Sequence, residues 1–515
     1  MNDTSDQSTD QAARRMPVGL FLRLATMMAL QWGVWVWFPF LGMFLLDGKE
    51  FSANQLANIF VVAAIGIMLA PFIAGQLVDR YVATEKYMGV AHLLAAVAIW
   101  QLTWVDSYWA FLLISLLYSL LFGPTTALAN SLALHHVPDR DRHFGIIRVC
   151  GSLGFIPASI FLGHWLAHEH SPDPPRVVEM LVQEGEVPET DRAELLRRRH
   201  VKVAGQPEVV GSLIRQDDQK IVLQTDEGEK TFDKSKATIR DADVIKRRRE
   251  KQVALGIADG FKMSAVLGII MGLYCFTLPH TPPQKGEQKY AFMEALGEIR
   301  RQPLITLFLV GLPLSCVHQV YFIHTGRFIE TFAFRTNWID QIFGVGGGGM
   351  MTLGQMSEVV LMVTIGLYAA RFHRKTLLLL GLLAYIVRFG LFAYAGQLED
   401  VTGISPTVSV IVALLMHGFC FTWFWFLGYL IVDEETTPDV RGSAQSLYNL
   451  VLLGFGAILG SQFAAFIANR SEIPGDQLTY DYTALFSWPL WGSVFCFFAL
   501  LIFYPKKSKH QKRTR

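Results

Sequence analysis

This chain has little charge and few cysteines for its length. Only 17% of its 515 residues are charged, and the net charge is +1. Soluble domains average about 25% charged residues, and a balance so close to zero gives no sign of a nucleic-acid partner. The five cysteines are odd in number and widely scattered, which predicts neither a disulfide framework nor a zinc site. They are Cys150, Cys275, Cys316, Cys420 and Cys496.

Long apolar runs dominate instead. Apolar residues make up 52% of the chain, including 37 Phe and 12 Trp. A transmembrane helix needs about 20 mostly apolar residues, so we predict an all-α membrane protein with twelve transmembrane helices in two six-helix bundles. The expected spans are roughly 18–46, 54–78, 86–105, 107–134, 144–166, 256–279, 303–326, 348–371, 375–397, 404–432, 442–468 and 484–504.

A hydrophilic stretch separates the fifth and sixth expected spans. We predict a first half at 1–166, an insert at 167–255, a sixth helix with a central cytoplasmic loop at 256–302, and a second bundle with a basic tail at 303–515. In short connections and termini, Lys and Arg recur on one side if both termini are cytoplasmic. The expected location is the plasma (inner) membrane. The insert would lie on the opposite side, because long loops translocate largely regardless of charge.

The insert itself predicts a small β-rich module. Val209–Ile214, Lys220–Gln224 and Lys230–Phe232 alternate as strands do, and Asp226-Glu227-Gly228 is typical of a hairpin turn. Asp191–Arg199 predicts a short charged helix before a barrel of three to five strands. Since no catalytic pattern occurs there, we expect a docking or spacer role with an unknown partner.

One acidic residue interrupts an apolar run. Glu358 lies near the middle of Met350–Ala370, where a charge costs at least about 2.5 kcal/mol and marks a functional candidate. Gln355 is three residues earlier and shares its helix face. Arg148 lies inside the fifth span, and buried charge is tolerated chiefly when paired. We therefore expect an Arg148–Glu358 contact across the two halves, although Glu358 could also be a structural hydrogen-bonding residue.

A loop motif closes the second span. The segment Gly75-Gln76-Leu77-Val78-Asp79-Arg80 resembles the G-x-L-x-D-R motif of the major facilitator superfamily. Gly75 permits close helix approach, and Asp79 can accept hydrogen bonds from helix-terminal amides or pair with a basic residue. The resemblance implies a gating role for Gly75, Asp79 and Arg80; the alternative is an ordinary helix end.

Further segments resemble the nucleoside:proton symporter family within that superfamily. They are Leu278-Pro279-His280, Gln355-Met356-Ser357-Glu358, Arg388–Tyr394, Arg441–Gln445 and Gly454-Phe455-Gly456. The resemblance runs along nearly all the spans and leaves out the insert. It implies a secondary active transporter for proton-coupled nucleoside uptake by alternating access. We expect a monomer in the lipid bilayer, with a nucleoside and a proton as its partners.

The resemblance also implies a substrate site. Its expected residues are Arg148, Ser152, Phe155, Gln319, Gln355, Glu358, His417, Phe421 and Thr422. Glu358 and His417 are the expected proton-coupling pair. This chain departs from the family at Phe322, where an asparagine is usual, at His417, where a tyrosine is usual, and at Thr422, where an aspartate is usual.

Two other functions fit the same residues. Aromatic and amide side chains would suit a carrier for a sugar or another small polar solute. A membrane sensor or scaffold could keep the fold and act through the insert. An enzyme is not indicated, because no nucleophile–base set or metal cluster appears, and we expect no cofactor.

Overall fold

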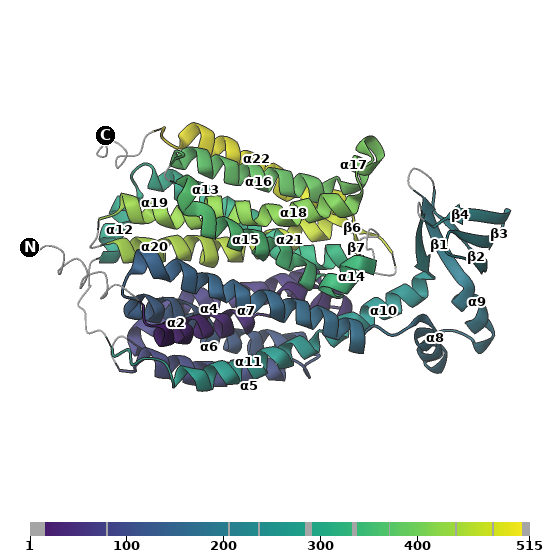
Figure 1. Cartoon of the computed structure of the whole chain (residues 1–515), viewed down its shortest axis with the longest axis horizontal. Helices are drawn as coiled ribbons and strands as arrows, with labels where there is room; N and C mark the ends of the chain where they lie inside the picture. The colour runs from purple at the N-terminus through teal and green to yellow at the C-terminus, as the bar shows by residue number, and fades with distance from the viewer. Residues whose placement is uncertain are drawn as a thin grey trace, which may run out of the picture.

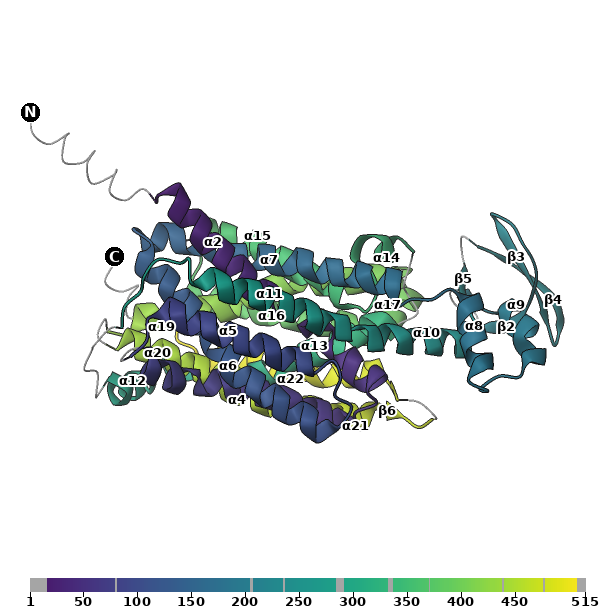
Figure 2. The same ribbon diagram turned by 90° about the horizontal axis from the view of Figure 1, so that it is seen from below.

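The computed structural model of this chain is a bundle of long helices with a small β-sheet beyond one end (Figure 1). Viewed from below, helix α10 leads from the bundle toward that sheet (Figure 2). We call this the sheet end of the bundle and the opposite one the far end. The structure describes residues 16–78, 81–203, 207–234, 237–283, 291–331, 337–369, 371–437, 440–475 and 478–506.

Ten helical segments of the described chain are long and apolar enough to cross a membrane. Helices suit this role because they satisfy their own backbone hydrogen bonds in lipid. The segments are α2 (Val18–Gly33) with η1 (Phe38–Phe40), α3 (Leu41–Met43) and η2 (Phe44–Gly48); α6 (Tyr108–His136); α7 (Arg140–Glu169); α10 (Asp243–Gly256) with α11 (Ala258–Cys275); α13 (Leu304–Thr331); α15 (Gly348–Ala369); α16 (Arg374–Ala393); α18 (Pro406–Cys420) with η4 (Phe421–Phe426) and α19 (Leu427–Glu435); α20 (Arg441–Asn449) with η5 (Leu450–Phe455) and α21 (Gly456–Ser471); and α22 (Tyr482–Phe503).

Two of the twelve predicted spans are not among these ten. α4 (Ala53–Leu77) contributes a shorter apolar stretch, Ala53–Leu69, and α5 (Thr84–Gln101) begins with the charged residues Glu85 and Lys86. Both helices pack inside the bundle, α4 against α6 and α21, and α5 against α6 and α11. The count of twelve spans therefore stays a prediction.

Short elements complete the bundle. They are α12 (Ala291–Ile299), α14 (Asn337–Phe343), α17 (Ala395–Thr402) and the strand pair β6 (Glu472–Ile473) and β7 (Thr479–Tyr480). Large apolar side chains are exposed on the outer helix faces, for example Leu113, Val363 and Phe495. Such a surface suits contact with lipid chains rather than with water.

The residues between α7 and α10 form three short helical elements and a five-stranded antiparallel sheet in the order β4-β3-β2-β1-β5. The sheet encloses a small core of its own, Val201, Ile221 and Leu223. The elements are α8 (Pro174–Gln183), η3 (Glu189–Asp191), α9 (Arg192–Arg197), β1 (Arg198–Val203), β2 (Val209–Gln216), β3 (Lys220–Thr225), β4 (Gly228–Asp233) and β5 (Ala237–Asp241).

The turn between β2 and β3 is held by a carboxylate. The backbone N–H groups of Gln219 and Lys220 donate to Asp217, and these bonds lower the pKa of its carboxyl group. The predicted helix Asp191–Arg199 is wrong at its end, since Arg198 and Arg199 begin β1. There Arg199 pairs with Asp241 of β5, and their side chains lie 3.4 Å apart.

At the sheet end, glycines let the two halves touch through their backbones. A Cβ at Gly42 of α3 would lie 2.5 Å from the carbonyl oxygen of Ile323 in α13. A Cβ at Gly326 of α13 would lie 2.4 Å from the carbonyl oxygen of Pro39 in η1. Both distances are too short for any side chain, so glycine is required for this closure.

An ion pair reinforces the same closure. Arg327 of α13 donates from Nε and Nη2 to the carboxylate of Asp47 in η2, at 2.8–3.0 Å. Arg327 also donates from Nη2 to the carbonyl oxygen of Leu478 at 2.6 Å, and its guanidinium lies 5.0 Å from the Tyr480 ring centre. A bidentate pair of this kind fixes orientation as well as charge.

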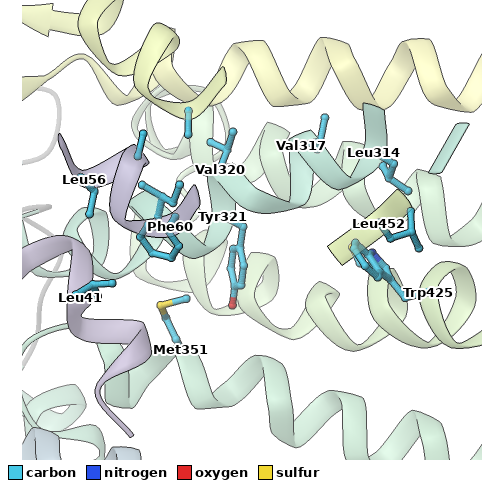
Figure 3. Packing of buried hydrophobic residues seen from close by; sticks show 14 of the residues in the cluster. Leu41, Leu56, Phe60, Leu314, Val317, Val320, Tyr321, Met351, Trp425 and Leu452 are labelled. Atoms are coloured by element: carbon cyan, nitrogen blue, oxygen red, sulfur yellow. The ribbon is translucent and has the colours of Figure 1, made fainter. Parts of the chain in front are cut away.

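Behind this closure the apolar core runs across both halves. Leu41 and Phe60 of the first half belong to one buried cluster with Tyr321, Met351 and Trp425 of the second (Figure 3). Further along, α7 packs against α15 and α4 packs against α21. We call this contact surface between the first and second halves the seam.

Candidate functional site

Glu358 lies where α15 leaves the tightest part of the seam. The first residues of this helix, Gly348–Thr352, are fully buried, whereas Gln355–Val359 is half-buried and Val360 is exposed. The Glu358 side chain keeps 13% of its accessible surface. The carboxyl group is therefore deep in the bundle without being sealed into the core.

Small residues bring α18 against α15 at this level. The backbone N–H of Gly418 donates to Ser357 Oγ at 3.0 Å, and a Cβ at Gly418 would lie 2.4 Å from that oxygen. A Cβ at Gly354 would lie 2.9 Å from His417 Cβ. This close approach places Nε2 of His417 3.9 Å from Oε2 of Glu358.

The other side of His417 meets a buried arginine. Arg388 of α16 is fully buried and donates from Nη1 to His417 Nδ1 at 3.0 Å. Its guanidinium lies 3.8 Å from the ring centre of Tyr321, 5.0 Å from that of Phe389 and 5.3 Å from that of Tyr385. These faces stabilise a buried cation through the ring quadrupole. Among the described residues, Nε and Nη2 of Arg388 find no hydrogen-bond partner.

A second histidine stacks on the first. The rings of His318 and His417 have centroids 5.5 Å apart and are inclined by 22°. Trp425 Nε1 donates to the Tyr385 hydroxyl at 2.8 Å, and that hydroxyl lies 2.6 Å from His318 Nδ1. Phe322 stands edge-on to His318 at 4.8 Å. Phe322, at the position where the resemblance implied an asparagine, is thus part of an aromatic wall.

Arg148 faces this group from the first half, on α7. Its guanidinium lies 4.3 Å from the ring centre of Trp32 in α2, and Gly151 makes room for that indole. The charges of Arg148 and Glu358 attract one another across the seam. The expected direct contact is not formed among the described residues: Glu358 lies beside His417, and Arg148 stacks on Trp32.

The remaining predicted site residues are distributed along the seam. Phe421 stacks on His417 at 6.4 Å, and the neighbouring Thr422 is fully buried with no described hydrogen-bond partner for its hydroxyl. Both lie in η4, a π-helical turn of a kind frequent at functional sites. Gln319 instead donates to Ser461 of α21 at 3.3 Å, which turns its amide group toward that helix.

Three further predicted residues lie on α15 and α7, which pack against each other. Gln355 is half-buried one turn before it, and its buried Oε1 has no described partner. On α7, Ser152 is half-buried and Phe155 is 9% exposed. The structure brings Glu358, His417 and Phe421 together, with Gln355 one turn away on α15 and Arg148, Ser152 and Phe155 on α7, which packs against α15.

The predicted gating motif is only partly described. Gly75 lies in α4, and Asp79 and Arg80 lie outside the described residues. The nearby Leu278-Pro279-His280 segment contacts the first half through Glu85. Oε1 of Glu85 lies 2.8 Å from His280 Nδ1, and Oε2 accepts from the backbone N–H of Thr281 at 3.0 Å.

The residues that surround His417 are only partly visible in the sequence. The sequence leaves Arg388 open between a structural partner and a cavity residue, and it does not predict His318, Tyr385 or Trp425 at the site. The available signal for Arg388 was the one that identified Glu358, a charge inside a long apolar run. No group of metal-ligating side chains occurs among the described residues.

Known proteins resemble this chain along most of its length. The putative nucleoside transporter YegT of Escherichia coli is 24% identical over 473 residues, covering 90% of this chain and 89% of that protein. Nucleoside permease NupG of Escherichia coli is 21% identical, covering 86% of each chain. The crystal structure of the nucleoside transporter NupG aligns with a TM-score of 0.65 at 19% identity, covering 94% of this chain and 98% of that one. This likeness shows the fold.

The family model described as nucleoside H+ symporter matches residues 18–178 and 257–510. It leaves out the segment that contains the five-stranded sheet. The match spans well over half of the chain and confirms the prediction from the sequence motifs. This chain belongs to the nucleoside H+ symporter family.

Proposed function

We propose that this protein is an integral inner-membrane transporter that couples nucleoside uptake to proton entry by alternating access. The observation that carries the proposal is the half-buried Glu358 carboxyl group, placed at the seam beside stacked aromatic rings. Protonation of such a group removes a charge from the interior. It therefore changes the relative free energies of the conformations, which is what coupling requires.

The proposed substrate site uses the clustered residues. Phe421 and Phe155 offer ring faces to a base, with the buried His417 ring stacked behind Phe421, and Gln355 offers an unpaired amide oxygen to base or ribose donors. Arg148, Ser152, Gln319 and Thr422 complete the proposed set. Glu358 takes the proton, with His417 as its coupling partner, and Gly75, Asp79 and Arg80 form the proposed gate.

We also propose how the chain is arranged in the membrane. Twelve helices form two bundles at 1–166 with 256–302 and at 303–515, both termini are cytoplasmic, and the sheet end faces away from the cytoplasm. The closed sheet end, with the Asp47–Arg327 pair across it, then corresponds to an outward-closed conformation. The carrier acts as a monomer, and the insert at 167–255 is a docking or spacer module.

The test is transport by the full chain in proteoliposomes. Labelled uridine and adenosine are offered with and without an imposed pH gradient, acid outside, in the presence of a panel of unlabelled sugars. We expect accumulation above equilibrium that requires the gradient and is inhibited by nucleosides but not by sugars. Inhibition by a sugar would identify the other carrier specificity, and absence of any uptake would favour a sensor or scaffold.

A further inference from the structure

The buried arginine determines which nitrogen of His417 carries a proton. A guanidinium has only N–H donors and no acceptor. In its 3.0 Å contact with Arg388 Nη1, His417 Nδ1 must therefore be the acceptor and must be unprotonated. A neutral imidazole then carries its single proton on Nε2, the nitrogen that lies 3.9 Å from the Glu358 carboxylate.

We propose that Arg388 is a positioning residue for proton coupling. It holds His417 neutral, with the Nε2–H directed at Glu358, so that the imidazole acts as a hydrogen-bond donor to the carboxylate rather than as a carrier of the transported proton. This inference rests on the proposed function. It assigns a role to a buried cation that substrate binding does not use.

A second proton on His417 would be opposed by its whole surroundings. It would set an Nδ1–H donor against the donor of Arg388 and place two positive charges side by side. His318 and Tyr321 of α13 stack against the ring at 5.5 Å and 5.0 Å and supply no negative charge. Across the described residues, Glu358 is the acid that faces His417, and Arg148 faces Glu358 from α7.

The contacts of Arg388 with His417 and of His417 with Glu358 favour one protonation state of Glu358. When Glu358 is ionised, the Nε2–H of His417 can close the 3.9 Å gap and bond to the carboxylate. When Glu358 takes a proton from water, the carboxylate becomes a neutral acid and that charge-assisted bond is lost. No proton passes through His417 in either step. Arg388 therefore favours proton release from Glu358 in this conformation.

The alternative is that Arg388 only stabilises the fold through the rings around it. A double-mutant cycle separates the two roles. Arg388→Gln removes the obligatory donor, and His417→Gln keeps an amide able to donate to Glu358 but unable to titrate. Arg388→Lys retains a positive donor and serves as the conservative variant. Proton-driven uridine accumulation and gradient-independent exchange are measured against pH for each full-length variant in proteoliposomes.

We expect Arg388→Gln to lower accumulation about tenfold and to move the midpoint of the pH profile upward, while Arg388→Lys restores the wild-type midpoint. His417→Gln should slow uptake yet keep it proton-driven. In the His417→Gln background, Arg388→Gln should cause no further shift. If Arg388→Gln lowers the amount of folded protein, Arg388→Met, which keeps the length of the side chain but has no charge and no N–H donor, carries the same comparison alone and with His417→Gln.

Two outcomes overturn the inference. Loss of all proton-driven accumulation in His417→Gln would make His417 the carrier, and additive shifts from Arg388 and His417 would show that Arg388 acts independently. Both outcomes can be observed in the variants while the wild-type protein accumulates uridine normally. Failure of the wild type to respond to the gradient would instead remove the proposed function.

Discussion

The two levels of the seam are built from different chemistry. At the sheet end, backbone meets backbone at Gly42 and Gly326, and the bidentate Asp47–Arg327 pair completes the contact. Around Glu358, the helices are half-buried and several polar atoms have no described partner. The first arrangement favours one conformation strongly, and the second leaves hydrogen-bonding capacity for a ligand. A carrier by alternating access needs both properties at once, at different depths.

The largest effect is expected around Glu358, where several polar atoms have no described hydrogen-bond partner. Glu358→Gln keeps the shape and polarity of the side chain but cannot gain or lose a proton. We expect it to abolish uridine accumulation driven by a pH gradient while uridine exchange persists. The matched control is Glu229→Gln on the exposed strand β4, which should behave as wild type. Unchanged accumulation in Glu358→Gln would remove this carboxyl group from the coupling mechanism.

The fold could be predicted from the sequence where local hydropathy decides it. Apolar runs identified the spans that cross the bundle, and α5, which carries Glu85, Lys86 and His92, is not among the ten. In the insert, the charged stretch ending at Arg199 favoured a helix by local pattern. Pairing of Arg199 with Asp241, 42 positions later, places it in β1, and a pairing of that range is not visible in a local window.

The site residues show the same limit: the sequence identifies a charged residue but not its neighbours in the fold. Glu358 was found because a charge in an apolar run is conspicuous without any knowledge of its neighbours. Its partner was predicted to be Arg148, another charge inside a span. The rotation of α7 instead directs Arg148 over Trp32, and the contact of α18 with α15 brings His417 to Glu358. Helix rotation and contact depend on packing across the whole bundle, which periodicity alone does not determine.

The ion pair at the closed level should give the next largest effect. Arg327→Gln leaves the Asp47 carboxylate without its bidentate partner, and breaking a buried pair typically costs about 3–5 kcal/mol. The side chains of Arg327 and Asp47 are 4% and 21% exposed, so we expect a cost in the lower part of that range. We expect the sheet end to open. A cysteine introduced at Leu41, which is buried behind the pair, should then react faster with a thiol reagent, whether or not uridine is being transported.

The control for this change is Arg470→Gln, which removes an exposed cation that stacks on Phe466 near the same end. It should leave labelling at position 41 unchanged. Exchanging the charges as Asp47→Arg with Arg327→Asp should restore part of the protection. Equal labelling in Arg327→Gln and in the parent protein would show that backbone packing alone keeps this end shut.

A smaller effect is expected from adding one methyl group to the seam. Gly326→Ala places a Cβ 2.4 Å from the Pro39 carbonyl oxygen, so the halves must separate slightly. Overpacking of this kind typically costs about 1–3 kcal/mol, and we expect a lower melting temperature and partial labelling at position 41. Gly145→Ala, on a helix face with nothing within 4 Å, is the matched control and should neither lower the melting temperature nor increase labelling at position 41.

The smallest effect is expected from the sheet, because its core is separate from that of the bundle. Val201, Ile221 and Leu223 form a cluster of their own, whereas α10 packs against η2 of the bundle, and its Lys251 pairs with Glu50 just beyond η2 at 2.5 Å. Since Arg199 and Asp241 are paired neighbours, residues 200–240 can be replaced by a short Gly/Ser linker that keeps α10 in place. We expect uridine uptake per folded molecule to change less than about twofold, an interaction energy within the range of independent sites.

Lys251→Gln in the intact chain is the companion variant, because it tests the α10 contact without removing the sheet. Loss of uptake on sheet deletion, at normal membrane levels, would make the sheet part of the transport cycle and favour a function exercised through a docked partner.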